Sequence, residues 1–413
     1  MSLIDEIAGM AARMESEQIT LKEAILNNTT VRVSDDTIDG MDRLIYNHCL
    51  NKKALADLLG KSRNTLSKIL SELEQKELIS APINQNKNHL YTRFDVANIM
   101  EALKLPTYRD YNNPVVIVVE NHKGGTGKST TTVTLAVAAA LDLHLNARIC
   151  VVDFDPQGTI GNHLIRNASD GSIYLTMADV LLKKHEPNKA YAEYINGGFA
   201  EEEIICNMPF QTHLPNLHVI PAFPADERFT DKYWAMSDEE KLELITRFKE
   251  VVVPALKSKY DLILIDTPPQ DSPLIWAANE GADGILVPLT PREYDFASTT
   301  NYMKTMSKRL VQLPSKGQNL KWLKVLAVNV DDKSQHEMQI LQKLARTAQD
   351  KFLSTNIKSS EAFKAAAGTS RTVLDIKKSE DMCPSKQFDI AEISVRSVYQ
   401  QFITEIRTFS AVS

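Results

Sequence analysis

A glycine-rich segment between an apolar run and a helical pattern constrains the fold of this chain more than any other feature. The segment is KGGTGKST, residues 123–130. Residues 115–120 (VVIVVE) read as a buried strand, and the pattern after the glycines predicts a helix from residue 128 to about 143. Glycines let backbone N–H groups turn toward an anion, and the start of the next helix adds the positive end of its dipole. The order strand, glycine loop, helix therefore predicts a phosphate-binding loop.

The side chains of this loop indicate a nucleoside triphosphate with Mg²⁺ as the ligand. Lys128 is expected to reach the β- and γ-phosphates, and the Ser129 hydroxyl is expected to bind Mg²⁺. The loop departs from the standard GxxxxGK[ST] pattern, whose first glycine would fall at His122, and carries a lysine at Lys123 instead. The predicted nucleotide-binding residues of the loop are Lys123, Gly124, Gly125, Thr126, Gly127, Lys128, Ser129 and Thr130.

Carboxylates follow two further apolar runs and complete the predicted magnesium site. Asp266 ends the run in DLILIDTPP and is the candidate that holds Mg²⁺ through water. Asp153 and Asp155 lie two apart in VVDFDPQGT, so in an extended strand both would point to the same side. The alternative interpretation is that these acids only cap turns or helices.

The remainder of the second part of the chain alternates strand and helix patterns, which predicts an α/β fold with a mostly parallel sheet flanked by helices. This P-loop NTPase domain is expected over residues 115–413, after a linker at residues 105–114 that is rich in proline and asparagine. The further strands are expected at residues 147–153, 217–221, 262–266, 284–288 and 323–330.

The chain before the linker is predicted to be helical. Residues 1–30 are expected to form one long helix whose apolar stripe packs either on its own domain or on a second copy of itself. A second helix is expected from a cap at Ser34 to about residue 50. Residues 31–104 are expected to form a DNA-binding domain, either all-helical or winged by a hairpin within residues 81–94.

Residues 52–80 have the spacing of a helix-turn-helix. Ala56, Gly60 and Leu66 fit the small residue, the turn glycine and the apolar packing position, and Ser62 is a good N-cap. A scaffold for protein contacts is the alternative interpretation. The predicted DNA-binding residues are Lys61, Ser62, Arg63, Asn64, Thr65 and Lys68, with Lys87 on the wing.

Composition limits the remaining function classes. The net charge is −6 and the pI about 5.9, so any DNA binding has to come from local basic patches. The four cysteines show no paired spacing and are expected to be reduced thiols. We find no signal peptide and no apolar run long enough for a membrane span, and therefore expect a cytoplasmic protein without a membrane partner.

In KGGTGKST, VVDFDPQG, DLILIDTPP and GADGILVPLTP, residues 115–413 resemble the ParA/MinD group of P-loop ATPases, and the DPQG motif favours the ParA branch. The resemblance implies ATP, ADP and Mg²⁺ as ligands, and Lys123 as a catalytic residue that reaches the partner's phosphates across a dimer. It implies the catalytic role of Lys128, and a water-positioning role for Asp155. Among the metal residues Ser129, Asp153 and Asp266, it makes Asp266 the Walker B acid. It also implies switch segments at residues 156–158 and 267–269, and an adenine contact from Asn329 after a later strand.

The resemblance further implies a DNA-partition ATPase with weak intrinsic activity that works as a homodimer on the nucleoid. Its implied partners are nonspecific DNA, its own operator, and a ParB-like centromere-binding protein that stimulates hydrolysis. The alternative is a transcriptional repressor whose ATPase tunes operator binding. Candidate surfaces for nonspecific DNA are Lys304, Lys308 and Arg309, or Lys358, Lys364 and Arg371. The apolar C-terminal helix is expected to dock on the core, with a membrane-targeting helix as the alternative.

Overall fold

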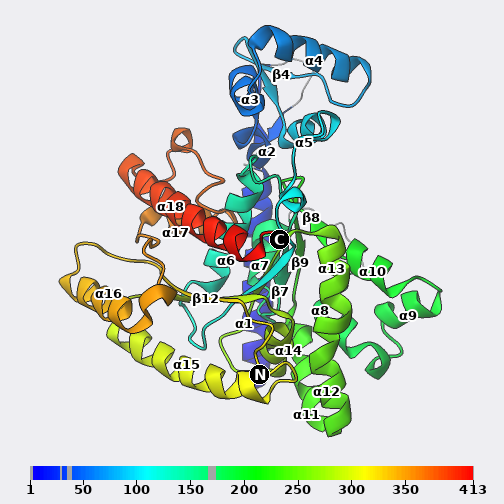
Figure 1. The fold of residues 1–413 in the computed structure, drawn as a ribbon, viewed down its shortest axis with the longest axis vertical. Coiled ribbons are helices and arrows are strands. Elements are labelled where there is room, and N and C mark those ends of the chain that lie inside the picture. Colours follow the sequence, from blue (N-terminus) through cyan, green and yellow to red (C-terminus); the bar gives the residue numbers. More distant parts are fainter. Residues whose placement is uncertain (1–2, 28–29, 35–39, 166–173, 413) are drawn as a thin grey trace. The chain divides into compact units, whose positions relative to one another are not determined.

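The computed structural model describes residues 3–27, 30–34, 40–165 and 174–412. It divides into two compact units, Met1–Lys104 and Leu105–Ser413, and each is described by itself (Figure 1).

The first unit begins with the long helix α1, Leu3–Asn27. Several of its apolar side chains are exposed, among them Leu3, Ile4 and Met14 at 67–76%. The other elements of this unit are β1 Thr30–Val31, β2 Met41–Asp42, α2 Arg43–Asn47, β3 Leu50–Asn51, α3 Lys52–Leu59, α4 Arg63–Gln75, β4 Ile83–Gln85, β5 Asn88–Tyr91 and α5 Arg93–Ala102.

The helix predicted over residues 34–50 is wrong for most of its length. Residues 35–39 lie outside the described residues, and the five-residue α2 is the only helix in the rest of that range. Gly40 has φ +85°, a conformation that a continuous helix does not contain. The Asp42 carboxylate then accepts a hydrogen bond of 2.7 Å from the Leu44 N–H and starts α2 at Arg43.

Helices α3 and α4 follow one another across a short turn, at the residues where the helix-turn-helix is predicted. Gly60 ends α3 in the left-handed region at φ 58°, and Ser62 caps α4 by accepting from the Thr65 N–H at 3.2 Å. Leu66 and Ala56 are buried between the helices.

A hairpin follows the pair, as the winged alternative expects. Strands β4 and β5 are antiparallel, and β5 also pairs with β3. Asn86 and Lys87 both have positive φ, 48° and 65°, which fits a two-residue type I′ turn.

The second unit is built on a seven-stranded sheet in the order β12-β11-β6-β10-β7-β9-β8. All neighbouring strands run parallel except β8, which pairs antiparallel with β9 at one edge. The strands are β6 Val115–Val119, β7 Ile149–Asp153, β8 Phe210–Gln211, β9 Leu217–Ile220, β10 Leu262–Asp266, β11 Gly284–Leu289 and β12 Trp322–Ala327.

Both faces of the sheet are covered by helices, which confirms the predicted α/β layers (Figure 1). Val116 and Val118 of β6 point into one core, while Ile117 and Val119 point into the other. The helices are α6 Lys128–Leu141, α7 Thr159–Leu164, α8 Met177–Leu182, α9 Ala190–Asn196, α10 Glu201–Asn207, α11 Arg228–Ala235, α12 Asp238–Arg247, α13 Val253–Lys259, α14 Pro273–Gly281, α15 Glu293–Gln312, α16 Gln335–Ala348, α17 Glu361–Ala367 and α18 Ser385–Ser410, with shorter turns η1 Tyr108–Asp110, η2 Lys183–His185, η3 Pro224–Glu227, η4 Phe248–Val252, η5 Gln349–Lys351 and η6 Lys378–Glu380.

The last helix and the segment before the sheet are tied to each other. Val395, Val398 and Phe402 of α18 are fully buried, and α18 packs on α6. The Tyr108 hydroxyl lies 2.9 Å from the Ser410 hydroxyl, and the Asn113 N–H donates to the Ser410 carbonyl at 2.7 Å. Residues 105–114, expected as a linker, are therefore packed on the second unit. Within the described residues, no helix is long and apolar enough to cross a membrane.

Candidate nucleotide site

The glycine loop turns from the end of β6 into the start of α6. Gly125 and Gly127 have φ 75° and 76°, so side-chain-bearing residues would be strained at both positions. A Cβ on Gly127 would also lie 3.3 Å from the Val328 side chain. Two hydrogen bonds within the loop stabilise its conformation. The Lys123 carbonyl accepts one from the Thr126 hydroxyl at 3.2 Å and one from the Lys128 ammonium at 3.3 Å.

The Ser129 hydroxyl and the Asp266 carboxylate meet at the carboxyl end of the sheet. The hydroxyl donates to Asp266 Oδ2 at 2.6 Å, and the Thr132 hydroxyl donates to Oδ1 at 3.2 Å. Asp266 is fully buried at the end of β10. Oxygen ligands of this kind are what Mg²⁺ prefers, so the Ser129–Asp266 pair fits the predicted metal position.

The two acids after β7 have different surroundings. Strand β7 ends at Asp153, so the expected strand alternation does not extend to Asp155. The Asp153 carboxylate accepts from the Asp155 N–H at 3.0 Å and the Ile160 N–H at 3.3 Å, and so it organises the loop. Asp155 Oδ1 accepts a local hydrogen bond, from the Gln157 N–H at 3.0 Å.

Burial sets the protonation of this cluster. Asp153 and Asp266 are register partners on neighbouring strands, and both are at most 1% exposed. Burial first, and for Asp153 also the charge of Asp266, raises the pKa of both carboxyls. Burial lowers the pKa of the Lys128 ammonium, while Asp266 and Asp155 raise it. Burial thus disfavours the ionised form of both carboxyls, and a nearby lysine or a bound cation favours it.

Lys123 does not point freely to solvent. Its ammonium forms an ion pair with the carboxylate of Asp295, a residue in the first turn of α15. The side chain of Lys123 is 35% exposed and that of Asp295 is 9% exposed. The sequence prediction did not include Asp295, which is 172 residues away from Lys123.

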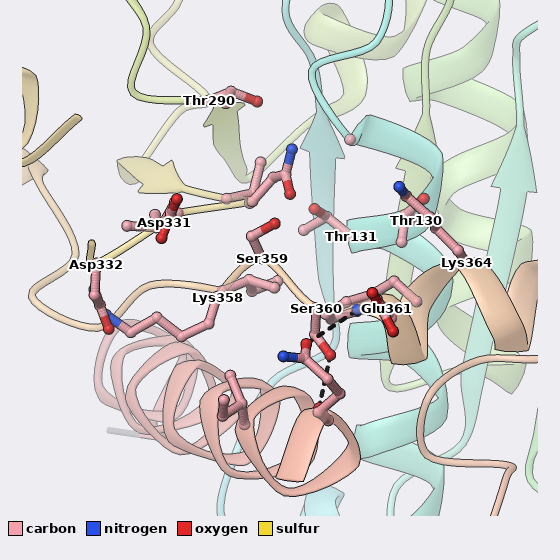
Figure 2. A pocket seen from close by; sticks show the side chains of 18 of the residues that line it. Thr130, Thr131, Thr290, Asp331, Asp332, Lys358, Ser359, Ser360, Glu361 and Lys364 are labelled. Atoms are coloured by element: carbon pink, nitrogen blue, oxygen red, sulfur yellow. Dashed lines mark hydrogen bonds and ion pairs between the residues drawn. The ribbon is translucent and has the colours of Figure 1, made fainter. Parts of the chain in front are cut away.

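A cavity of about 680 Å³ opens beside the glycine loop. Figure 2 shows that its lining comes from α6, from the segment after β12 and from the segment leading into α17. Asn329, with φ 55°, lines this cavity together with Gly125 and Thr130. The lining residues that the sequence did not indicate include Thr131, Asp331, Ser359, Ser360, Glu361 and Lys386, and Lys364 was predicted only as part of a DNA surface.

One missed residue near the metal position carried a sequence signal. Thr132 is three residues after Ser129 on α6, so both hydroxyls lie on one face of the helix and reach Asp266. The cavity residues around Ser360 and Lys386 had no comparable signal, because only the folded chain brings α17 and α18 to the loop.

The predicted DNA-binding residues of the first unit lie on its surface. Lys61, Arg63, Asn64 and Lys68 are exposed around the start of α4, and Lys87 is exposed at the hairpin turn. Ser62 and Thr65 are exposed too, but their hydroxyls lie 2.9 Å from each other within the cap.

In each candidate patch for nonspecific DNA, the arginine is engaged in contacts within the protein. Arg309 stacks 3.9 Å from the Trp276 ring centroid and bonds Asp271 at 2.9 Å. Arg371 has a side chain only 6% exposed and is paired with Glu380 at 2.6 Å. Among the remaining candidates, Lys304, Lys308 and Lys364 are exposed, while Lys358 is paired with Asp332.

Known proteins are similar to this chain in sequence and in fold. A family model described as an AAA domain matches residues 115–321. Plasmid partition protein A of Escherichia coli is 28% identical over 302 residues, which cover 70% of this chain and 72% of that protein. Sporulation initiation inhibitor protein Soj of Bacillus subtilis is 26% identical over 253 residues, which cover 60% and 87%.

Solved structures agree with these relatives. A structure titled "Partition Protein" superposes with a TM-score of 0.65 at 19% identity, covering 97% of this chain and 98% of its own. A complex of Cyanothece McdA with ATP has a TM-score of 0.51 at 16% identity, covering 70% and 97%. These structures share the fold of this chain. The domain match over half of the chain and the sequence relatives show that the chain belongs to the ParA family of partition ATPases.

Proposed function

We propose that this protein moves or positions DNA by cycling between an ATP-bound dimer on DNA and a released ADP state. The observation that carries the proposal is the convergence of Lys128, the Ser129–Asp266 pair and Asp155 at the glycine loop, two glycines of which, Gly125 and Gly127, line the cavity. Buried lysine and carboxylate groups around a glycine loop suit phosphoryl transfer to water, which depends on positioning and on charge stabilisation.

In this proposal the cavity holds the nucleoside and the glycine loop holds the phosphates. Asn329 is positioned at the cavity to contact the adenine, and Lys128 faces the β- and γ-phosphates. Ser129 and, through water, Asp266 would hold Mg²⁺ with support from Asp153, and the bound ion would neutralise phosphate charge. Asp155 positions the attacking water, because among the described residues its carboxylate has one side-chain hydrogen bond, the local one from the Gln157 N–H.

ATP hydrolysis switches the protein between a dimer and separate subunits if Lys123 completes the nucleotide site of a second copy. A single subunit then has an incomplete site, ATP joins two subunits, and hydrolysis separates them. The ATP dimer binds nonspecific DNA through exposed lysines such as Lys304 and Lys308, and a ParB-like partner stimulates its slow hydrolysis.

The first unit supplies operator binding and autorepression. Its α4 presents Arg63 and Asn64 at an exposed N-terminal end, which is the geometry of a recognition helix in the major groove. The exposed stripe of α1, with Leu3, Ile7 and Met14, suits pairing with the same helix of a second copy.

The test is DNA binding by the full chain with ATP, with ADP and without nucleotide, at several salt concentrations. The two probes are random DNA and DNA from upstream of its own gene. Random-DNA binding that requires ATP, together with operator binding in ADP, supports the proposal. Operator binding that is indifferent to nucleotide, without binding to random DNA, would favour a repressor that keeps the ATPase for control.

A further inference from the structure

Three residues on one face of helix α15 contact the residues that lead into the glycine loop. Tyr302 donates its hydroxyl proton to Glu120, the Asn121 amide donates to the Thr299 hydroxyl at 3.1 Å, and Lys123 pairs with Asp295. Asp295, Thr299 and Tyr302 are spaced four and three residues apart, so they lie on one face of the helix. Each of the three is at most 6% exposed.

The Lys123–Asp295 pair conflicts with the proposed role of Lys123 in a dimer. One ammonium group cannot bind the carboxylate of its own subunit and the phosphates of a partner subunit at the same time. Forming the ATP dimer therefore requires this ion pair to open in both subunits.

The free-energy cost of opening the ion pair depends on the burial of the Asp295 carboxylate. This carboxylate is 9% exposed, so the departure of Lys123 leaves a nearly buried charge without its cation. The position in the first turn of α15 offsets part of this cost, since the helix N-terminus favours a negative charge. Replacing the carboxylate by an amide removes both the attraction to Lys123 and the unpaired charge.

We propose that Asp295 is a positioning residue that holds Lys123 within its own subunit and thereby raises the ATP concentration needed to close the dimer. The inference rests on the proposed role of Lys123 across the dimer interface. Asp295 acts only through Lys123, so every effect of removing its charge requires the lysine to be present.

The experiment is a double-mutant cycle on the full chain with a fluorescent, non-hydrolysable ATP analogue and Mg²⁺. Asp295→Asn is expected to lower the half-saturating analogue concentration by about tenfold, since two pairs open per dimer. The analogue is also expected to dissociate more slowly from Asp295→Asn. In the Lys123→Ala background the same substitution should change neither quantity.

Two controls separate this effect from the loss of an acid near the phosphates. Glu293→Gln removes a carboxylate from the same helical turn, but that carboxylate pairs with the exposed Lys343, so the variant is expected to match the wild type. A fluorescent ADP should bind the wild type and Asp295→Asn alike. Asp295→Ser provides a second uncharged variant if Asp295→Asn does not fold.

The outcomes distinguish the proposed role of Lys123 from that of Asp295. If the wild type and Lys123→Ala bind the ATP analogue equally, the proposed cross-subunit role of Lys123 fails. If those two differ but Asp295→Asn matches the wild type, only the role of Asp295 is overturned. A gain from Asp295→Asn that persists in the Lys123→Ala background also overturns it, because the carboxylate then acts directly on the nucleotide.

Discussion

The ammonium of Lys128 is held inside the glycine loop, where it donates to the Lys123 carbonyl at 3.3 Å in a residue that is 7% exposed. We expect Lys128→Ala to weaken ATP binding by about 10- to 100-fold, because a charged hydrogen bond to a buried phosphate is lost. Titration calorimetry with ATP and Mg²⁺ measures the change. Lys343→Ala, at an exposed ion pair, is the control. Unchanged ATP turnover in Lys128→Ala would refute the assignment of the nucleotide site.

Glu120 is a buried acid next to the loop, and burial raises its pKa to about 7 despite the hydrogen bond from Tyr302. The charge of Asp271 raises this pKa further and that of Lys128 lowers it. Because the folded pKa exceeds the unfolded value, the protonated acid favours the fold. This contribution is complete below the unfolded pKa and is lost as the pH rises through about 7.

We therefore predict a pH-dependent stability difference between the wild type and Glu120→Gln, whose amide cannot ionise. From pH 5 to pH 8 the wild type should lose about 2 kcal/mol relative to the variant. Urea unfolding at each pH measures the free energy of unfolding. Parallel pH profiles for the two proteins would mean that Glu120 does not titrate in this range.

Among the helices, α18 shows how a sequence stripe becomes a buried face. Phe402 is fully buried and its ring lies 5.9 Å from that of Trp322, whereas Ile393 on the same helix is 64% exposed. We expect Phe402→Ala to destabilise the second unit by about 3–5 kcal/mol and Ile393→Ala by less than about 0.5 kcal/mol.

Tryptophan fluorescence in urea tests this, because Trp234, Trp276 and Trp322 all lie in the second unit. Similar losses in both variants would contradict docking of α18 by one face.

The strands of the second unit could be predicted because buried parallel strands are nearly continuous apolar runs, as in residues 115–119. The edge strand β8 could not, since its two residues have no periodicity to detect. The helix expected over residues 34–50 failed for a local reason, the positive φ of Gly40.

The same division applies to the candidate site. Lys128, Ser129 and Asp266 follow from a loop and a strand end that local patterns identify. Asp295 and Lys386 were missed, and Lys364 was not predicted at the cavity, because their positions depend on contacts between segments far apart in the sequence.

In the complete ATPase cycle, substitution of Asp155 is expected to affect ATP hydrolysis but not ATP binding. Its carboxylate is not needed to shape the loop as that of Asp153 is. Asp155→Ala should therefore bind ATP and dimerise, but release phosphate at least about 100-fold more slowly. Phosphate release and sedimentation in ATP measure the two properties, with the exposed Asp350→Ala as the control. Normal hydrolysis by Asp155→Ala would remove its proposed role.

The two compact units predict that the two modes of DNA binding are separable. Arg63 is exposed at the start of α4 in the first unit, whereas the lysines proposed for nonspecific DNA lie in the second. Arg63→Ala should weaken operator binding by about 1–3 kcal/mol if its guanidinium contacts a guanine. ATP-dependent binding to random DNA should be unchanged.

Lys76→Ala, at the opposite end of the same helix, is the matched control and should retain operator binding. Titrations of both variants with operator and random DNA at fixed salt make the comparison, because phosphate contacts weaken steeply as salt rises. An equal loss of both binding modes in Arg63→Ala would mean that one surface serves both. Operator recognition and nonspecific binding could then not be assigned to different units.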